Sequence, residues 1–157
     1  MRIALIFTGK TTERFIKEGI DNYINRISKY ITFEIITIPE IKNTRNMPVR
    51  EQKIKEGAKI FQSIRSDDYV ILLDEKGTEY TTAEFAGMFE KALMVQRKRI
   101  VFIIGGPWGF ADEVYSKAQL VLSLSRLTFS HQLVRLLFLE QLYRILTVIN
   151  GDPYHHE

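Results

Sequence analysis

Short apolar runs alternate with longer amphipathic segments along the whole chain. Continuous runs of apolar and β-branched residues predict strands at residues 3–7, 33–38, 69–73, 99–104 and 120–124. Apolar residues at helical spacing predict helices at residues 12–26, 48–65, 82–93, 112–117 and 131–149. This alternation predicts a single α/β domain over residues 1–157, in which a mostly parallel sheet lies between two layers of helices.

Two of the predicted helices carry an apolar stripe that indicates which side faces the core. The first begins at Pro48, a residue suited to the first turn of a helix. Its expected inner side chains are Ile54, Ala58, Phe61 and Ile64. The second is capped by Thr81 or Thr82, and its expected inner side chains are Phe85, Met88, Phe89 and Leu93.

The last predicted helix is apolar on nearly every side, which is typical of a helix that is deeply buried or shared with a partner subunit. Of these two readings we favour a subunit interface. Arg135, Glu140 and Arg144 interrupt the apolar run. Glu140 and Arg144 have the spacing of an ordinary helical salt bridge, whereas Arg135 and Arg144 are expected on different faces of the helix.

Composition narrows the class of protein only slightly. The formal net charge is +3, a mild basic bias that an RNA-binding protein shares with many small enzymes. Without cysteine the chain has no disulfide, thiolate metal site or cysteine nucleophile. No apolar run reaches the roughly 20 residues that span a bilayer, so we expect no membrane segment. His155 and His156 lack a third ligand at suitable spacing, so we also expect no metal.

Residues that could bind a ligand or take part in catalysis gather where predicted strands end, at 72–77, 104–109 and 122–131. Ligands of open parallel sheets bind beyond these carboxyl ends. Gly105 and Gly106 permit positive φ or close approach of another group, but their surroundings match neither a Walker loop nor a GxGxxG fingerprint. A structural turn and a ligand loop are equally compatible with this cluster.

The loop after the last predicted strand is unusually apolar, with Leu122, Leu124, Leu127 and Phe129. Loops are usually polar and exposed, so we expect this one to be buried, either as core or as the wall of a pocket for an apolar-faced ligand such as adenine. The tail at 152–157 is open to two readings: a disordered end, or a segment that becomes ordered against RNA or another subunit.

Several motifs in order carry a family resemblance that covers essentially the whole chain. They are Leu73-Asp74 with Gly77, Ile104-Gly105-Gly106-Pro107 with Gly109, Ser123-Leu124-Ser125 through Thr128 to His131 with Leu133-Val134-Arg135, Glu140-Gln141-Leu142-Tyr143-Arg144, and Pro153-Tyr154-His155. With this spacing the chain resembles the RlmH family of bacterial SPOUT methyltransferases.

The resemblance implies a deep trefoil knot within about residues 70–157, which general topology rules disfavour. It also implies that two crossing loops form a pocket for S-adenosylmethionine, with no metal. The cofactor-binding residues that it implies are Leu73, Gly105, Leu124, Ser125, Arg126, Leu127, Thr128 and Phe129.

The same resemblance implies a cytoplasmic homodimer that methylates N3 of a pseudouridine in 23S ribosomal RNA on the ribosome, with an active site completed across the subunit interface. The substrate-contacting or catalytic residues that it implies are Arg144, His131, Tyr154 and His155. The imide proton of N3 must leave, so we expect His155 to act as base and Arg144 to stabilise the developing negative charge.

Three positions depart from the family pattern. Trp108 stands where relatives often have Glu, Gln132 where Pro often follows the histidine, and His156 where a basic residue is common. We expect Gln132 to loosen the start of the last helix, Trp108 to change the edge that its loop presents, and His156 to remove a phosphate contact. Two alternatives remain open: a non-catalytic RNA- or ribosome-binding module, and a SPOUT enzyme with another target such as tRNA.

Overall fold

The computed structural model describes residues 1–154, and its centre is a sheet of five parallel strands in the order β2-β1-β4-β3-β5. The strands are β1 (Arg2–Thr8), β2 (Thr32–Ile38), β3 (Asp68–Glu79), β4 (Arg99–Ile104) and β5 (Leu120–Ser123). The predicted parallel sheet is thus confirmed. Within this part of the chain no helix is long and apolar enough to cross a membrane.

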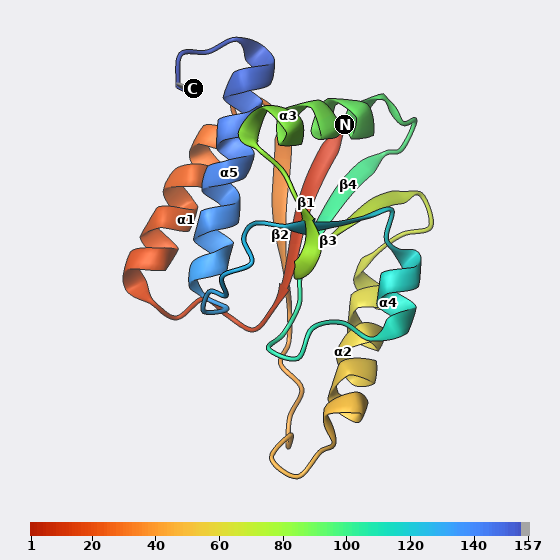
Figure 1. Cartoon of the computed structure of the whole chain (residues 1–157). Coiled ribbons are helices and arrows are strands. Elements are labelled where there is room, and N and C mark those ends of the chain that lie inside the picture. Colours follow the sequence, from red (N-terminus) through yellow and green to blue (C-terminus); the bar gives the residue numbers. More distant parts are fainter. Residues whose placement is uncertain (155–157) are drawn as a thin grey trace.

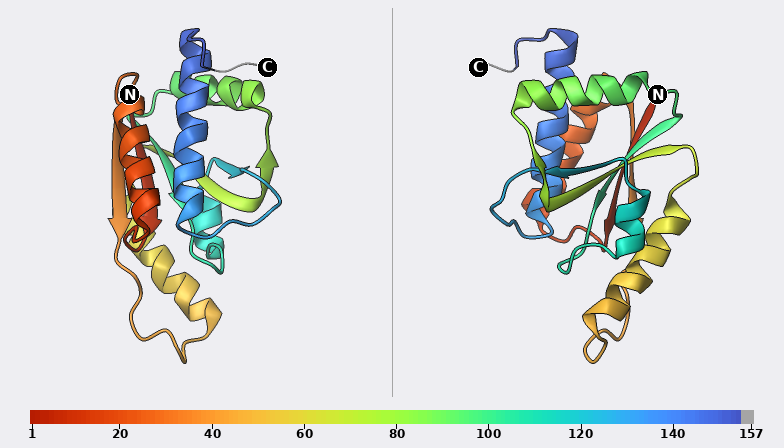
Figure 2. Two further views of the ribbon diagram at one scale, coloured as in Figure 1. Left: turned by 90° about the vertical axis from the view of Figure 1, so that its left-hand side faces the viewer. Right: turned by 45° about the vertical axis from the view of Figure 1, so that its right-hand side comes forward.

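Helices cover both faces of the sheet (Figures 1 and 2). On one face lie α1 (Arg14–Ile27), α3 (Thr82–Met94) and α5 (Leu133–Asn150), and on the other lie α2 (Val49–Ser63) and α4 (Asp112–Lys117). Helix α5 packs against both α1 and α3. The three layers predicted from the sequence are therefore present.

The apolar strands form two cores, one on each side of the sheet. Every residue of β4 is buried, because this strand has a neighbour on each edge and helices over both faces. Its side chains alternate, with Phe102 in the core beneath α1, α3 and α5, and Val101 and Ile103 in the core beneath α2 and α4. Burial on both faces explains why the strand sequence is a continuous apolar run.

Helix α3 has the predicted inner face, but α2 does not. Thr81 forms a capping box with Glu84, and Phe85 and Phe89 are buried. In α2, by contrast, Ile54, Ala58 and Phe61 are exposed and Ile64 is only partly buried, so the predicted inner face is wrong.

Gly57 explains the orientation of α2. A Cβ atom at Gly57 would lie 3.1 Å from Cγ2 of Val114 in α4, so the glycine allows the two helices to approach closely. Gly57 and Ile60 are therefore the buried residues of α2. The larger apolar side chains that defined the sequence stripe are turned toward solvent.

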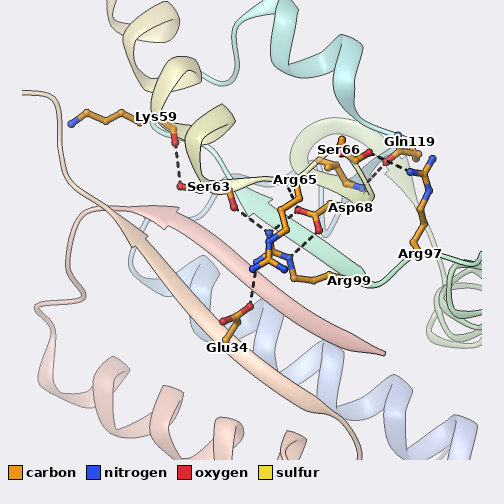
Figure 3. Close-up of polar contacts among 10 residues, drawn as sticks. Glu34, Lys59, Ser63, Arg65, Ser66, Asp68, Arg97, Arg99 and Gln119 are labelled. Carbon is orange, nitrogen blue, oxygen red and sulfur yellow. Dashed lines mark hydrogen bonds and ion pairs between the residues drawn. The ribbon is translucent and has the colours of Figure 1, made fainter.

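The amino edge of the sheet is closed by a buried ionic network (Figure 3). Arg99 at the start of β4 bonds to Asp68 at the start of β3, with Nε–Oδ1 at 3.0 Å and Nη2–Oδ2 at 2.7 Å. It also bonds to the carbonyl of Ser63 at 3.1 Å and to Glu34 at 3.2 Å. Hydrogen bonding to Asp68 raises the pKa of Arg99. This network leaves the opposite, carboxyl edge for ligands.

Candidate functional site

Three of the predicted cofactor segments meet at the carboxyl edge of the sheet. Leu73 of β3 pairs with Ile104 of β4 on one side and with Leu122 of β5 on the other. Gly105 directly follows Ile104, and Leu124 follows shortly after Leu122. Leu73, Gly105 and Leu124 therefore lie at neighbouring strand ends, because parallel strands end at the same edge.

The glycine loop after β4 has the close approaches that the sequence predicted, although its positive φ falls elsewhere. A Cβ atom at Gly105 would lie 3.0 Å from the ring of Phe110. Gly106 donates its N–H to Oε1 of Glu56 at 3.0 Å. Among the glycines of this loop, positive φ occurs at Gly109, at +78°, and neither Gly105 nor Gly106 adopts it.

A second close approach occurs where β3 continues beyond its pairing with β4. There the pairing of β3 with β5 shifts between Leu73 and Thr78. A Cβ atom at Gly77 would lie 2.6 Å from the carbonyl oxygen of Val121, which is backbone and cannot move aside cheaply. The segment 74–79 and the end of β5 therefore pass each other in direct contact.

Asp74 fixes the start of that segment. It accepts a hydrogen bond from the Lys76 backbone at 2.9 Å and another from the Tyr115 hydroxyl of α4. Burial, followed by the bond to Asp74, raises the pKa of Tyr115 to about 12. The hydroxyl of Tyr115 therefore stays protonated at neutral pH and holds the end of β3 against α4.

One prediction fails in the loop after β5. This loop contains Ser125, Arg126, Leu127, Thr128 and Phe129. Leu127 is 75% exposed and Phe129 is 39% exposed, so the expected burial of the apolar loop fails for these two residues. Bonds within the loop shape it, because Ser125 Oγ accepts from Leu127 N–H at 3.0 Å. Arg126 reaches Glu79 at 3.2 Å. Leu122 is buried and Leu124 partly buried, as expected. Beyond Leu124 the loop turns away from the core.

Gln132 holds the start of α5 in place, so the expected loosening there is wrong. Its Oε1 accepts from the Thr12 backbone at 2.9 Å, and its Nε2 donates to the Lys10 carbonyl at 3.1 Å. These bonds tie the start of α5 to the segment between β1 and α1. His131, the residue before it, is exposed and lines a cavity with the Gly105–Gly109 loop.

Arg135 and Arg144 lie in different places, as their spacing predicted. Arg135 is 2% exposed and stacks on Phe7, with its guanidinium carbon 3.9 Å from the ring centroid. It donates to Thr11 Oγ1 at 2.9 Å and to the Thr8 carbonyl at 2.8 Å. Arg135 therefore belongs to the carboxyl edge of the sheet.

Arg144 and Tyr154 form a separate cluster near the other end of α5. Arg144 makes the predicted salt bridge with Glu140 at 2.6 Å, and its guanidinium carbon lies 5.0 Å from the Tyr154 ring centroid. The Tyr154 hydroxyl lies 3.4 Å from the same Glu140 oxygen. Burial, followed by a hydrogen bond with Tyr154, raises the pKa of Tyr23 to about 12.

Within the described chain this cluster lies away from Gly105 and the rest of the glycine loop. Arg144 follows Arg135 by nine residues, which is roughly 14 Å along a helix. Arg135 lies at the carboxyl edge, so Arg144 and Tyr154 lie toward the amino edge. His155, the predicted base, lies outside the described residues, and so does His156. Within residues 1–154 no group of three His, Cys, Asp or Glu side chains could hold a metal ion.

Comparison with known proteins identifies the family. A family profile described as "Predicted SPOUT methyltransferase" matches residues 1–155. A protein of Parabacteroides distasonis is 48% identical over 157 residues, and one of Phocaeicola vulgatus is 46% identical; both matches cover 100% of each chain. Both proteins are called ribosomal RNA large subunit methyltransferase H. The chain therefore belongs to the SPOUT methyltransferases and, within them, to the family of ribosomal RNA large subunit methyltransferase H.

Solved structures agree on the fold. A tRNA (m1G37) methyltransferase of Aquifex aeolicus has a TM-score of 0.57 at 12% identity, over 100% of this chain and 76% of that one. A probable methyltransferase of Bordetella pertussis has a TM-score of 0.55 at 12% identity, over 92% of this chain and 96% of that one. At such identities the likeness shows a shared fold alone.

Sequence reasoning did not single out Glu56, which lies beside the glycine loop. It belongs to α2, a helix rich in charged residues, where the sequence gives no reason to distinguish it from a glutamate on a solvent-exposed face. Burial raises the pKa of its carboxyl group, while the Gly106 N–H opposes that shift. Its contact lies fifty positions away in sequence, so no local pattern could reveal it.

Proposed function

We propose that this protein transfers a methyl group from S-adenosylmethionine to N3 of a pseudouridine in 23S ribosomal RNA, on the assembled ribosome and thus in the cytoplasm. The observation that carries the proposal is the register that aligns Leu73, Gly105 and Leu124 at one sheet edge. The names of the relatives, which match over their full length, support ribosomal RNA as the substrate.

The carboxyl edge suits the cofactor in its shape and chemistry. Leu127 and Phe129 present apolar surface that no element of the described chain covers, and adenine has two apolar faces. In the same loop the backbone amides of Arg126 and Thr128 make no hydrogen bond within residues 1–154, so they can donate to a ligand. When bound, S-adenosylmethionine supplies an electrophilic methyl group. Ser125 shapes this loop through the hydrogen bond that its Oγ accepts from Leu127 N–H.

A trefoil knot within about residues 70–157 is part of the proposal. The contact of Gly77 with the Val121 backbone supports it, because two chain segments pass there without room for a side chain. The course of α5, which returns between α1 and α3, also supports it (Figure 1). Such a crossing would hold the cofactor segments in a rigid arrangement and so lower the cost of positioning them during reaction.

A homodimer completes the proposed site. Within one chain, Arg144 and Tyr154 lie toward the amino edge, nine residues of α5 beyond Arg135 in the case of Arg144, and so away from Gly105. A second copy would bring its Arg144, Tyr154 and His155 to the site. The Arg144 guanidinium would then stabilise negative charge on the imide as His155 accepts the N3 proton. Tyr154 and His131 would contact the substrate.

Methyl transfer from labelled S-adenosylmethionine to ribosomes that lack the modification tests this function, with free 23S RNA and tRNA in parallel. We expect label on a pseudouridine of 23S RNA in ribosomes. Label on tRNA alone would establish a SPOUT enzyme with another target. A folded protein that labels none of these substrates would point to a non-catalytic binding module.

A further inference from the structure

A cavity of about 280 Å³ opens at the carboxyl edge of the sheet, beside the cofactor segments. Its floor comes from the ends of β1 and β4, and one wall is the Gly105–Gly109 loop. Lys53 and Glu56 of α2 form a second wall, and His131 lies at the start of α5. Gly105 belongs both to this cavity and to the cofactor segments, so the two sites adjoin.

The cavity lies where the sheet changes its winding direction. Helix α1 follows β1 on one face of the sheet, whereas α4 follows β4 on the other face. Because β1 and β4 are neighbours, their outgoing loops separate and leave a crevice between them. In doubly wound sheets this crevice is the usual place of ligand binding. The cofactor segments follow β3, β4 and β5, so the crevice is available to a different ligand.

The walls of the cavity favour a neutral planar ring over an anion. Two carboxylates, Glu40 and Glu56, line it together with Lys53, Arg135 and His131, so an anion would meet carboxylates as well as cations. A ring that carries both N–H and C=O groups can donate to the carboxylates and accept from the cations. Trp108, which is 56% exposed, offers an aromatic face on which such a ring can stack.

Glu56 is placed to read one edge of that ring. Its carboxylate is partly buried, and within residues 1–154 the hydrogen bond it receives comes from Gly106 N–H, at 3.0 Å to Oε1. Oε2 lies against the same glycine, 2.8 Å from the position that a Cβ atom would take. A carboxylate held in this way has acceptor capacity left for a ligand at the boundary between the cavity and the cofactor segments.

We propose that this cavity receives the target base and that the Glu56 carboxylate accepts a hydrogen bond from N1–H, which pseudouridine has and uridine lacks. The assignment rests on the proposed function. In pseudouridine, N1 and N3 flank the same carbonyl group, so a ring bonded to Glu56 through N1 can direct N3 toward Gly105. In uridine, N1 carries the ribose, and Glu56 would stay buried without this partner. Glu56 would thus discriminate between the two bases.

A variant at Glu56 tests the discrimination on ribosomes that carry either pseudouridine or uridine at the target position. Glu56→Gln replaces one acceptor oxygen by an amide donor. We expect kcat/KM on pseudouridine to fall about tenfold, with little change on uridine, so the preference shrinks about tenfold. Glu51→Gln, the same change on an exposed part of α2, should keep the wild-type preference. Equal losses on both substrates, or an unchanged preference, would overturn the proposal.

The wild-type protein offers a second test, because Trp108 is its single tryptophan. Titration with a stem-loop RNA that contains pseudouridine should change the tryptophan fluorescence, at a lower RNA concentration than the uridine version requires. Methyl transfer by the wild type without any fluorescence response to either RNA would overturn the cavity assignment alone. No methyl transfer to either ribosome would overturn the proposed function and, with it, this assignment.

Discussion

The carboxylate of Asp68 and the guanidinium of Arg99 form a two-point ion pair across the amino ends of β3 and β4, with N–O distances of 3.0 and 2.7 Å (Figure 3). The two residues are register partners, and both side chains are almost fully buried. The pair fixes the amino edge of the sheet. The carboxyl edge, at the other end of the same strands, carries the cavity and the cofactor segments.

Removal of Asp68 should destabilise the fold strongly. In Asp68→Ala the Arg99 guanidinium keeps its bonds to Glu34 and Ser63 but loses its buried partner, and removal of one partner of a buried ion pair costs about 3–5 kcal/mol. Urea unfolding measures this loss. The control is Asp67→Ala, at a more exposed carboxylate that lies 3.9 Å from Lys98; it should change stability by about 0–1 kcal/mol. Similar losses in the two variants would contradict the central role of the Asp68–Arg99 pair.

A methyl group at Gly77 should destabilise the fold, whereas one at Gly87 should not. Gly77→Ala would place its Cβ 2.6 Å from the Val121 carbonyl oxygen, so the backbone must shift, at about 1–3 kcal/mol. Gly87→Ala in α3 meets nothing within 4 Å and should stabilise the helix by about 0.5–1 kcal/mol. Thermal unfolding of both variants checks this order. The changes in the free energy of unfolding should have opposite signs in the two variants. A Gly77→Ala variant that is more stable than the wild type would refute the close crossing.

Arg144→Ala should keep the fold and the affinity for S-adenosylmethionine while it abolishes methyl transfer. Arg144 is partly exposed and pairs with Glu140 on its own helix, so its loss should leave the cofactor segments in place. Titration calorimetry measures the affinity for S-adenosylmethionine, and a methyl-transfer assay measures the activity. Arg14→Ala, at an arginine that also pairs with a glutamate four residues on, is the control that should remain active.

Mixed dimers should distinguish a shared site from a site within one chain. Gly105→Val would bring a side chain against Phe110 and so disturb the cofactor segments. When it is mixed with Arg144→Ala, one site of each mixed dimer combines an intact cofactor region with an intact Arg144. We expect the inactive variants to recover methyl transfer on mixing. A mixture that stays inactive, although mixed dimers form, would rule out a site completed by the partner.

Glu56 should make the fold less stable as the pH rises. Burial raises the pKa of its carboxyl group above the ordinary value of 4.5, so the folded chain holds this proton more tightly than the unfolded chain. The stability that protonation contributes is present below that ordinary pKa and is lost as pH rises through the folded value. Glu56→Gln removes this loss. The free energy of unfolding of this variant should therefore rise relative to that of the wild type as the pH increases above 4.5. A difference that does not change with pH would contradict the prediction.

Much of the fold followed from the sequence because strands and helices are specified by neighbours along the chain. The run of apolar residues at 99–104 predicted a strand, and β4 is that strand, with every residue buried. Thr81 or Thr82 was the predicted cap of a helix, and Thr81 is the cap, through bonds with Glu84 that span three residues. That residues 72–77, 104–109 and 122–131 gather at one edge was also accessible, because the carboxyl ends of parallel strands point the same way.

Packing decided the rest, since contacts between distant segments leave no local pattern. The apolar stripe at 48–65 correctly predicted a helix but wrongly predicted which side of it faces the core. Gly57 faces Val114 of another helix, and this contact sets the orientation of α2. Leu127 and Phe129 were expected to be buried, yet they are 75% and 39% exposed. Gln132 departs from the family pattern and still secures its helix through backbone groups about 120 positions away.

The sequence by itself determined the class of protein, the order of its elements and the edge of the sheet that carries the cofactor segments. Only the tertiary structure decided that Arg144 lies away from Gly105 and that Glu56 lies beside Gly106. The physical reason is the range of the interactions. Hydrophobic periodicity and capping act over a few residues, whereas a functional site is made by side chains that meet only after the helices have packed on the sheet.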